Sequence, residues 1–144
     1  MNKLPSHSSS VGRMLVHLAF KVKYCHKIFD HPRIKAACES SFRKTLEEME
    51  VPCEEIGIDR DHSHFVLDIG IVPIDKIVKQ LKGRSAKKLL QTFPWLKEKY
   101  FWGSGVWNPS YYFDSLGKDA DQMKVYVRNQ GLPRKEKPLT SFTN

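Results

Sequence analysis

The segment DHSHFVLDIGI, residues 61–71, decides the fold because its side chains alternate between two kinds. Successive side chains of a strand point to opposite faces of a sheet, so this alternation predicts a half-buried strand. His62 and His64 share one face of it. The opposite face, which we expect to cover the core, carries the apolar residues Phe65, Leu67, Ile69 and Ile71.

The residues before this strand predict three further elements. Residues 14–24 alternate between apolar and polar side chains, which is typical of a half-buried strand. Asp30 is a candidate helix N-cap and Pro32 can occupy the first turn of a helix whose apolar residues recur at helical spacing as far as Met49. Residues 51–71 are too long for one ordinary strand, and the charged stretch from Asp59 to Asp61 predicts the turn of a hairpin.

The residues after the hairpin predict helices, one strand and a final helix. The expected elements are a helix over 73–81 that ends at Gly83, a helix over 85–92 capped by Ser85, a strand over 107–113 and a helix over 119–130. Together with the first half, this order predicts an α+β fold, a ferredoxin-like antiparallel sheet with helices on one face and an extra C-terminal helix. We expect one domain over residues 14–130, between flexible tails at 1–13 and 131–144.

Composition narrows the class of protein. Among 144 residues, lysine and arginine outnumber aspartate and glutamate by 24 to 16, giving a net charge of +8 and a pI near 9.4. An anionic partner is expected, nucleic acid before membrane. We expect a soluble, intracellular protein, because the chain has neither a membrane-length apolar run nor a signal-peptide core. The three cysteines, Cys25, Cys38 and Cys53, lack a C-x-x-C spacing and are expected to be reduced core thiols.

The histidine pair is a candidate metal site. Such a pair alone is more often an exposed or internally satisfied pair, but Asp59 and Asp61 lie beside it and add negative potential for a cation. Two imidazoles and one amide oxygen suit a divalent ion that keeps positions open for substrate oxygens. Gln130 can supply that amide.

Tyr126 is a candidate nucleophile. A tyrosine on a helix beside Met123 and Val127 is commonly a packing residue, yet Gln130 lies four residues after it and on the same helix face. If Gln130 binds the metal, Tyr126 lies one turn away, close to a phosphate held there. Attack by the phenol on that phosphate would give a covalent phosphotyrosine.

Five blocks of the chain carry a resemblance to a known family. They are HLAFKVKYCHKIF, DHSHFVLDI, LKGRSAKKL, FWGSGVWNPSYYFDSLG and YVRNQ, and they extend over nearly the whole chain from Val16 to Gln130. The chain resembles the single-tyrosine transposases of the HUH nuclease superfamily, which move small insertion sequences as single-stranded DNA.

This resemblance implies an activity and a set of roles. His62, His64 and Gln130 match the ligands of a divalent metal, Mg²⁺ or Mn²⁺, and Tyr126 matches the nucleophile. The implied enzyme cleaves single-stranded DNA at hairpin-bearing element ends, keeps the 5′ end on tyrosine, frees a 3′ hydroxyl, and rejoins ends without a nucleotide cofactor. It also implies a prokaryotic, cytoplasmic homodimer without membrane contact. Since the histidine face and the final helix both need cover, we expect two composite sites, each completed by the tyrosine helix of the other subunit.

Ser63 departs from the family pattern, in which a bulky apolar residue usually separates the histidines. Its side chain points toward the core, where a hydroxyl is tolerated if it bonds to backbone. The alternative function is therefore a catalytically silent or domesticated nucleic-acid-binding relative. A replication or plasmid-transfer nuclease of the same superfamily is a third alternative, which the short chain disfavours.

Two groups of residues are candidates for DNA contact. The basic residues expected on and between the two neighbouring helices after the hairpin are Lys76, Lys79, Lys82, Arg84, Lys87 and Lys88. The aromatic residues of the last strand that are candidates for stacking on unpaired bases are Trp107, Tyr111 and Tyr112.

Overall fold

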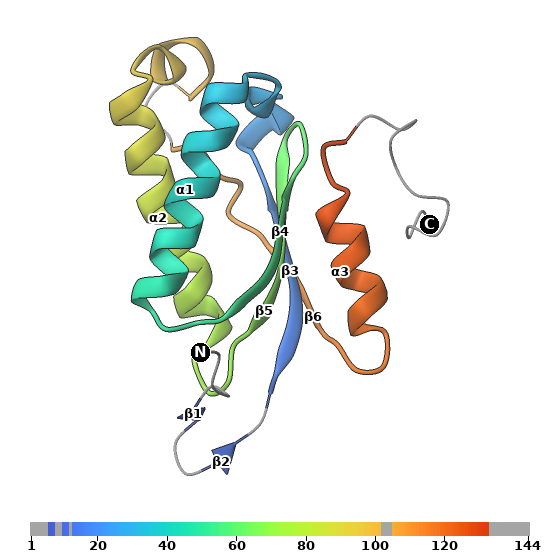
Figure 1. The fold of residues 1–144 in the computed structure, drawn as a ribbon. Helices are drawn as coiled ribbons and strands as arrows, with labels where there is room; N and C mark the ends of the chain where they lie inside the picture. Colours follow the sequence, from blue (N-terminus) through green and yellow to red (C-terminus); the bar gives the residue numbers. More distant parts are fainter. Residues whose placement is uncertain (1–5, 8–9, 12, 102–104, 133–144) are drawn as a thin grey trace.

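A four-stranded antiparallel sheet lies at the centre of the molecule (Figure 1). The computed structural model describes residues 6–7, 10–11, 13–101 and 105–132. Its strands, in the order in which they neighbour one another, are β4 (Cys53–Ile58), β5 (His62–Asp68), β3 (Leu15–Lys21) and β6 (Tyr112–Ser115). The short strands β1 (Ser6–His7) and β2 (Ser10–Val11) pair with each other within the expected N-terminal tail. Most of both expected tails lies outside the described residues.

The central pair of strands confirms the pattern read from residues 61–71. β3 and β5 are antiparallel, with Leu18 opposite Phe65 and Ala19 opposite His64. The β4–β5 hairpin turns over residues 59–61, as expected. Because the register is continuous from Leu15 to Lys21, every side chain of β5 keeps its face, and the two histidines share the face opposite Phe65.

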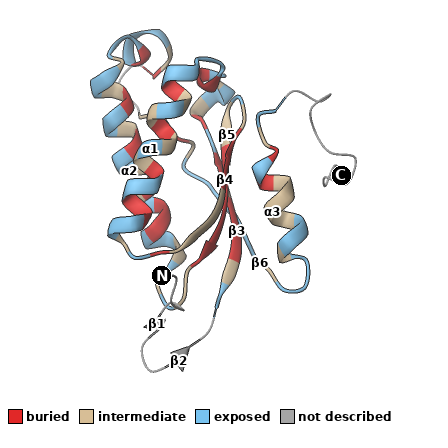
Figure 2. Ribbon diagram, viewed as in Figure 1, coloured by how far each residue is buried: buried red, intermediate tan, exposed pale blue. Residues whose placement is uncertain are grey.

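Two helices cover the apolar face of the sheet, α1 (Pro32–Glu48) and α2 (Ile74–Thr92). Figure 2 shows the buried residues along the strands and on the inner sides of these helices. The centre of this core is aromatic, because Phe20, Phe42 and Phe65 pack with ring centroids 4.9–5.9 Å apart. These three side chains are at most 3% exposed.

The prediction of two helices over residues 73–92 was wrong, because α2 runs through Gly83 without a break. Burial overrides the helix-ending preference of glycine here, since Leu81 and Leu89 are both fully buried on the core side of this one helix. Ser85, expected as a cap, is also fully buried, and its hydroxyl accepts a hydrogen bond from the indole N–H of Trp107 at 2.8 Å.

Two other boundaries differ from the expectation. The last strand is β6, and Trp107 contributes only an isolated bridge to Val22 before it. Asp30 lies in the short 3-10 helix η2 (Ile28–Asp30) and pairs with Arg60 at 2.9 Å, so it does not cap α1. The N-cap of α1 is His31, directly before Pro32 at the first helical position, as the proline suggested.

The final helix, α3 (Ala120–Arg128), lies on the other face of the sheet (Figure 1). Arg128 pairs with Glu55 of β4 at 2.9 Å, and Lys124 pairs with Glu54 at 2.9 Å. Lys124 is the largest cause of a lowered pKa for Glu54. Val127 is fully buried between helix and sheet. The expected α+β fold with an extra C-terminal helix is confirmed, and α3 of this same chain covers the histidine face.

All three cysteines are free thiols, as expected, but only Cys38 and Cys53 are covered by the fold, and Cys25 is exposed. Burial raises the pKa of Cys53 to about 12 and that of Cys38 well above its ordinary value, so neither is a ready nucleophile. Within the described part of the chain, none of the helices has the length and apolar character of a membrane span.

Candidate active site

His64 lies at the centre of the polar face and is almost completely buried. It is 6% exposed, on β5, under α3. Its Nδ1 shares a hydrogen bond with Nε2 of His17, at 3.2 Å, and the two rings are stacked with centroids 5.4 Å apart. Burial, followed by the charges of His62 and His17, lowers the pKa of His64 to about 3. His64 is therefore a neutral imidazole at ordinary pH, the form that binds metals.

The other nitrogen of His64 carries the most informative feature of the site. Nε2 is buried and has no hydrogen-bond partner among the described residues. A buried polar atom without a partner is costly and therefore uncommon in folded proteins. With Nδ1 engaged by His17, Nε2 is the nitrogen left for a ligand.

His62 shows the same arrangement closer to the surface. Its Nδ1–H donates a hydrogen bond to the Asp61 carboxylate at 2.5 Å, and its ring centroid lies 5.0 Å from that of His64. The expected proximity of Asp61 is thus confirmed. Asp59 acts otherwise, since its carboxylate accepts the backbone N–H of Arg60.

Gly57 allows α3 to approach the sheet at this point. It pairs with His64 across the β4–β5 ladder, so any side chain on it would share the histidine face. A Cβ at Gly57 would overlap the carbonyl oxygen of Val127 and lie 3.0 Å from Cβ of Gln130. The missing side chain is the space into which the end of α3 fits.

Tyr126 stands over the histidines from α3. Its ring centroid lies 5.8 Å from that of His64 and 6.3 Å from that of His17, in both cases nearly perpendicular. Tyr126 is half-buried, so its ring is held by these contacts while part of the side chain faces solvent. The structure thus brings together the expected nucleophile and one of the expected ligands within a single chain.

Gln130 follows α3 in a turn and lies over the same part of the sheet. Its amide nitrogen donates to the carbonyl oxygen of Tyr126 at 3.3 Å, and its Cβ lies over Gly57, the partner of His64. Since the NH₂ end is engaged by backbone, the oxygen end is the one suited to a cation.

The donors fit a divalent cation of limited protein coordination. Both histidines have Nδ1 engaged, and His64 offers a buried Nε2 without a partner. The described residues contain no group of three or more His, Cys, Asp or Glu side chains arranged to hold a metal ion. The Gln130 amide is the candidate for a third protein donor, and remaining positions would belong to substrate or water.

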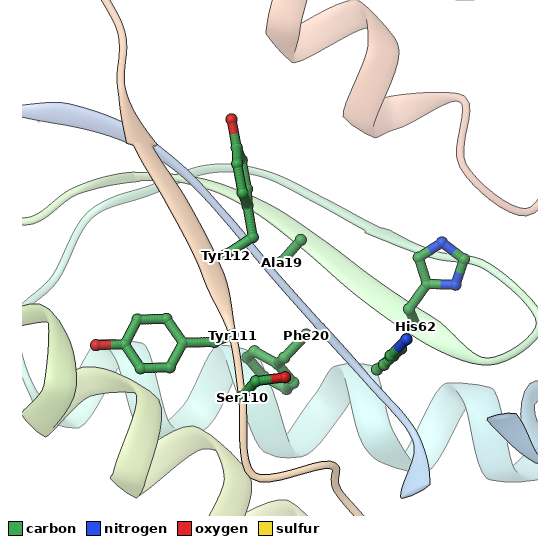
Figure 3. Close-up of a pocket in the computed structure, with 7 residues that line it drawn as sticks. Ala19, Phe20, His62, Ser110, Tyr111 and Tyr112 are labelled. Atoms are coloured by element: carbon green, nitrogen blue, oxygen red, sulfur yellow. The ribbon is translucent and has the colours of Figure 1, made fainter. Parts of the chain in front are cut away.

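A cavity of about 240 Å³ opens beside His62 (Figure 3). It lies where β3 and the segment before β6 separate. Tyr111 lies directly before β6 and Tyr112 is its first residue, and their side chains project in different directions. Tyr112 shares the face of His17, with ring centroids 5.6 Å apart. Tyr112 is 54% exposed and Tyr111 is 38% exposed. The remaining lining residues are Ala19, Phe20, Lys21 and Ser110.

Trp107 is not available for stacking on DNA bases, which corrects the expectation for this residue. It is 7% exposed, and its ring packs against Phe20 with centroids 4.8 Å apart. Its indole N–H is taken by Ser85. Trp107 is a core residue because the chain enters the sheet before β6 begins.

The six expected DNA-binding basic residues all lie on α2, which covers the opposite face of the sheet from the histidines (Figure 1). Lys82 donates to the carbonyl oxygens of Asn108 and Ser110 at 2.6 and 2.9 Å, and burial lowers its pKa. Arg84 pairs with Glu48 of α1 at 2.5 Å. The other four, all exposed, are Lys76, Lys79, Lys87 and Lys88.

Two residues of this site escaped the sequence analysis. They are His17 and Gly57, neither of which the sequence pattern singled out. The register could have found both, because His17 is two residues from Ala19, which lies opposite His64, and Gly57 is the other neighbour of His64. A bare glycine beside a paired histidine is the signal of a close approach.

The family description "Transposase IS200 like" matches residues 10–130, a range that contains the histidine pair, Tyr126 and Gln130. The chain belongs to the IS200-like transposase family. Over 119 residues it is 31% identical to the transposase for insertion sequence element IS200 of Salmonella typhimurium, covering 79% of this chain and 74% of the relative. It is 29% identical over 122 residues to ISDra2 transposase TnpA of Deinococcus radiodurans, covering 83% and 86%.

Solved structures agree with this IS200-like assignment. A crystal structure described as a transposase candidate from Deinococcus radiodurans superposes with a TM-score of 0.70 at 26% identity, covering 92% of this chain and all of that one. A REP-associated tyrosine transposase bound to a REP hairpin gives a TM-score of 0.60 at 9% identity, covering 88% and 70%, and shares the fold. The resemblance seen in the five sequence blocks is confirmed.

Proposed function

We propose that this IS200-type transposase cleaves and rejoins single-stranded DNA through a covalent bond to Tyr126. The observation that carries the proposal is the phenol ring of Tyr126 standing 5.8 Å from His64, whose Nε2 is buried and without a partner among the described residues. This proximity of the proposed nucleophile to a nitrogen that can bind a ligand supports the proposal.

The chemical step exchanges one phosphodiester for another. The Tyr126 oxygen forms a bond to phosphorus while the bond from phosphorus to the 3′ oxygen breaks, leaving the 5′ end on tyrosine. The phenol loses its proton and the departing 3′ oxygen gains one, so a free 3′ hydroxyl results. Attack by a 3′ hydroxyl on the phosphotyrosine reverses the step and joins the ends without nucleotide energy.

His62 and His64, with Gln130, would hold the divalent ion, Mg²⁺ or Mn²⁺. Such an ion, when bound, withdraws charge from the phosphate and favours attack by a phenol. The protein's own contribution is positional. Asp61 and His17 fix the two imidazoles, and Gly57 sets the distance at which α3 carries Tyr126 above them.

The test is trapping of the covalent intermediate. Labelled single-stranded DNA with Mg²⁺ or Mn²⁺ should give a denaturation-resistant adduct with the wild type and none with Tyr126→Phe. Tyr112→Phe is the matched control, because Tyr112 lies on the same face and also contacts His17. Adducts that persist in Tyr126→Phe and vanish in Tyr112→Phe would move the nucleophile to Tyr112. Full cleavage in the presence of a chelator would end the metal proposal.

A homodimer that recognises DNA hairpins at element ends is the second part of the proposal. The family resemblance supports the dimer, and a protein of the same fold is described as bound to a REP hairpin, which supports the hairpin. The need for a second subunit to cover the histidine face is gone, because α3 of the same chain covers it. Exchange of α3 between subunits is therefore proposed on the resemblance alone.

Mixing two inactive variants tests that exchange. His64→Ala lacks a ligand and Tyr126→Phe lacks the nucleophile, so a site formed within one chain stays inactive in every mixed dimer. Composite sites predict the return of adducts on mixing in equal amounts, at up to about a quarter of the wild-type level, because half of the dimers are mixed and each of these has one intact site of two. Light scattering on the same samples establishes whether dimers are present. A protein that is monomeric in solution would exclude composite sites.

DNA is proposed to contact both faces of the sheet. On the histidine side, Tyr112 and the cavity beside His62 suit an unpaired base next to the cleaved phosphate. On the other side, the exposed lysines of α2 suit phosphates of a hairpin. Lys79→Ala should weaken hairpin binding evenly across sequences and lower the slope of log affinity against log salt by about 0.9. An unchanged slope would remove Lys79 from the interface.

A catalytically silent DNA-binding relative remains the second candidate, and Ser63 favours it. Its hydroxyl is buried on the core face and has no hydrogen-bond partner among the described residues. The hydrogen bond to backbone that would make a serine tolerable there is therefore not formed with them. If wild-type protein binds hairpins yet forms no adduct, and Ser63→Val restores the adduct, this chain is a decayed transposase.

A further inference from the structure

We propose that His17 is a positioning residue that holds His64 in the tautomer able to bind a divalent ion. The inference rests on the metal role proposed above for His62 and His64. It concerns a residue of β3 that carries none of the proposed catalytic roles.

The geometry joins the two rings closely. His17 Nε2 and His64 Nδ1 lie 3.2 Å apart, and the rings are stacked with an interplanar angle of 11°. Both side chains are buried, at 7% and 6% exposure. Ala19 lies directly opposite His64 in the ladder, and its small side chain leaves the space in which the ring of His17 reaches its neighbour.

A hydrogen bond between two neutral imidazoles contains one proton, which lies on one of two atoms. If the proton lies on His64 Nδ1, then Nε2 of His64 carries a lone pair and can bind a cation. If it lies on His17 Nε2, then His64 carries its hydrogen on Nε2, as a buried donor without an acceptor among the described residues. Nε2 of His64 is without a partner among the described residues in either arrangement, so the groups around the ring of His17 decide where the shared proton lies.

The rest of the site follows the same scheme. Asp61 accepts Nδ1–H of His62, so each histidine of the pair is anchored through Nδ1 and leaves Nε2 free for a ligand. Asp114 pairs with His17 across β3 and β6 and acts on its ring by charge. Its negative charge favours a hydrogen on the nitrogen of His17 that is not engaged with His64, which is Nδ1, and this keeps Nε2 as the acceptor.

Two substitutions separate this role from simple packing. His17 also contacts the rings of Tyr112 and Tyr126, so its loss alone would disturb the face. His17→Phe keeps an aromatic ring in the stack but removes the acceptor. His17→Gln removes the ring but keeps an amide oxygen that can accept from His64.

The experiment uses full-length, ¹⁵N-labelled protein without metal. Long-range ¹H–¹⁵N spectra identify which nitrogen of each histidine carries hydrogen, and calorimetry then measures Mn²⁺ affinity. We expect His64 protonated on Nδ1 in the wild type and in His17→Gln, with most of the affinity kept. We expect His17→Phe to lose about 10- to 100-fold in Mn²⁺ affinity, the usual effect of removing such a partner. Thermal unfolding of each variant checks that it is folded.

Two results would overturn the inference. One is a wild-type His64 protonated on Nε2, a measurement that holds even if no variant folds. The other is wild-type Mn²⁺ affinity in a folded His17→Phe protein. A wild type that binds no Mn²⁺ while His64 is protonated on Nδ1 would refute the proposed metal role and leave the positioning of the tautomer standing.

Discussion

Two buried polar atoms without a hydrogen-bond partner among the described residues come from consecutive residues of β5 and lie on opposite faces of the sheet. Ser63 Oγ lies on the side of α1 and α2, opposite Phe20 in the ladder, and His64 Nε2 lies on the side of α3. The ladder partners of Ser63 are the apolar residues Phe20 and Ile58, so its hydroxyl is a defect in packing. The neighbours of His64 are His17, His62 and Tyr126, so its free nitrogen is a place for a ligand.

An unsatisfied buried atom has a different meaning on each face, because different forces hold the two faces together. The apolar face is stabilised by the hydrophobic effect, which has no preferred direction and does not depend on any single hydrogen bond. The polar face is held by directed contacts, including Glu54–Lys124, Glu55–Arg128 and the close approach at Gly57. Changes on the histidine face should therefore affect DNA cleavage as well as stability, whereas changes on the apolar face should affect stability alone.

The largest effect is expected from Gly57→Ala. The new methyl group would overlap the carbonyl oxygen of Val127, so α3 must move away from the sheet. We expect a loss of about 1–3 kcal/mol in the free energy of unfolding, the usual cost of overpacking. Adduct formation should fall by about 100-fold or more, because a displacement of about 1 Å misplaces the nucleophile. Denaturant unfolding and the adduct assay measure the two effects, and normal activity would show that α3 is not held as described.

A smaller effect is expected from acid on the metal-free protein. His64 has a folded pKa of about 3 and an unfolded pKa near 6.5, so the unfolded chain binds more protons as the pH falls between these values. The free energy of unfolding should therefore drop by about 2 kcal/mol from pH 7 to pH 5. Burial lowers the pKa of His17 as well, which acts with the same sign. His64→Asn should flatten this dependence in urea titrations, and an unchanged slope would mean that His64 is protonated in the fold.

Ser63→Ala tests the apolar face. Removing a buried hydroxyl without a partner among the described residues should raise the free energy of unfolding by about 1 kcal/mol, since the cost of stranding it disappears. Cleavage should stay unchanged, because the side chain points away from the histidines. A destabilised Ser63→Ala protein would indicate that the hydroxyl is bonded in solution.

Gly83→Ala is expected to have the smallest effect, and it is the control for Gly57→Ala. No described atom lies within 4 Å of the position its Cβ would take, in the middle of α2. Replacing glycine inside a helix should raise the free energy of unfolding by about 0.5–1 kcal/mol. Adduct formation should equal that of the wild type. Opposite signs for the two glycine substitutions would confirm that only Gly57 is required by a close approach.

The sequence predicted the elements that depend on local pattern. Alternation predicted β3 and β5, the helical spacing after Pro32 predicted α1, and both histidines lie on the expected face. Errors arose where tertiary packing decides. The break expected at Gly83 is absent, because α2 buries Leu81 and Leu89 on either side of it as one helix.

The sequence predicted which chemical groups form the candidate site but not how they are arranged in space. The spacing of His62 and His64 and that of Tyr126 and Gln130 bring each pair to one face, but they do not say which surface α3 covers. That depends on Gly57 and on ion pairs between residues about seventy positions apart, which only the folded chain brings together. His17 was missed for the same reason, since its contact with His64 follows from the register of β3 on β5.

The docking of α3 has a consequence for how many chains take part in one reaction. The sheet receives this helix through two carboxylates and one bare glycine, and these features would receive the α3 of another copy equally well. What favours the chain's own helix is the connector of residues 116–119, which keeps it at a local concentration on the order of millimolar. The length of that connector therefore sets the balance between docking of α3 on its own sheet and exchange of α3 between subunits. This length can be changed without altering any residue of the candidate site.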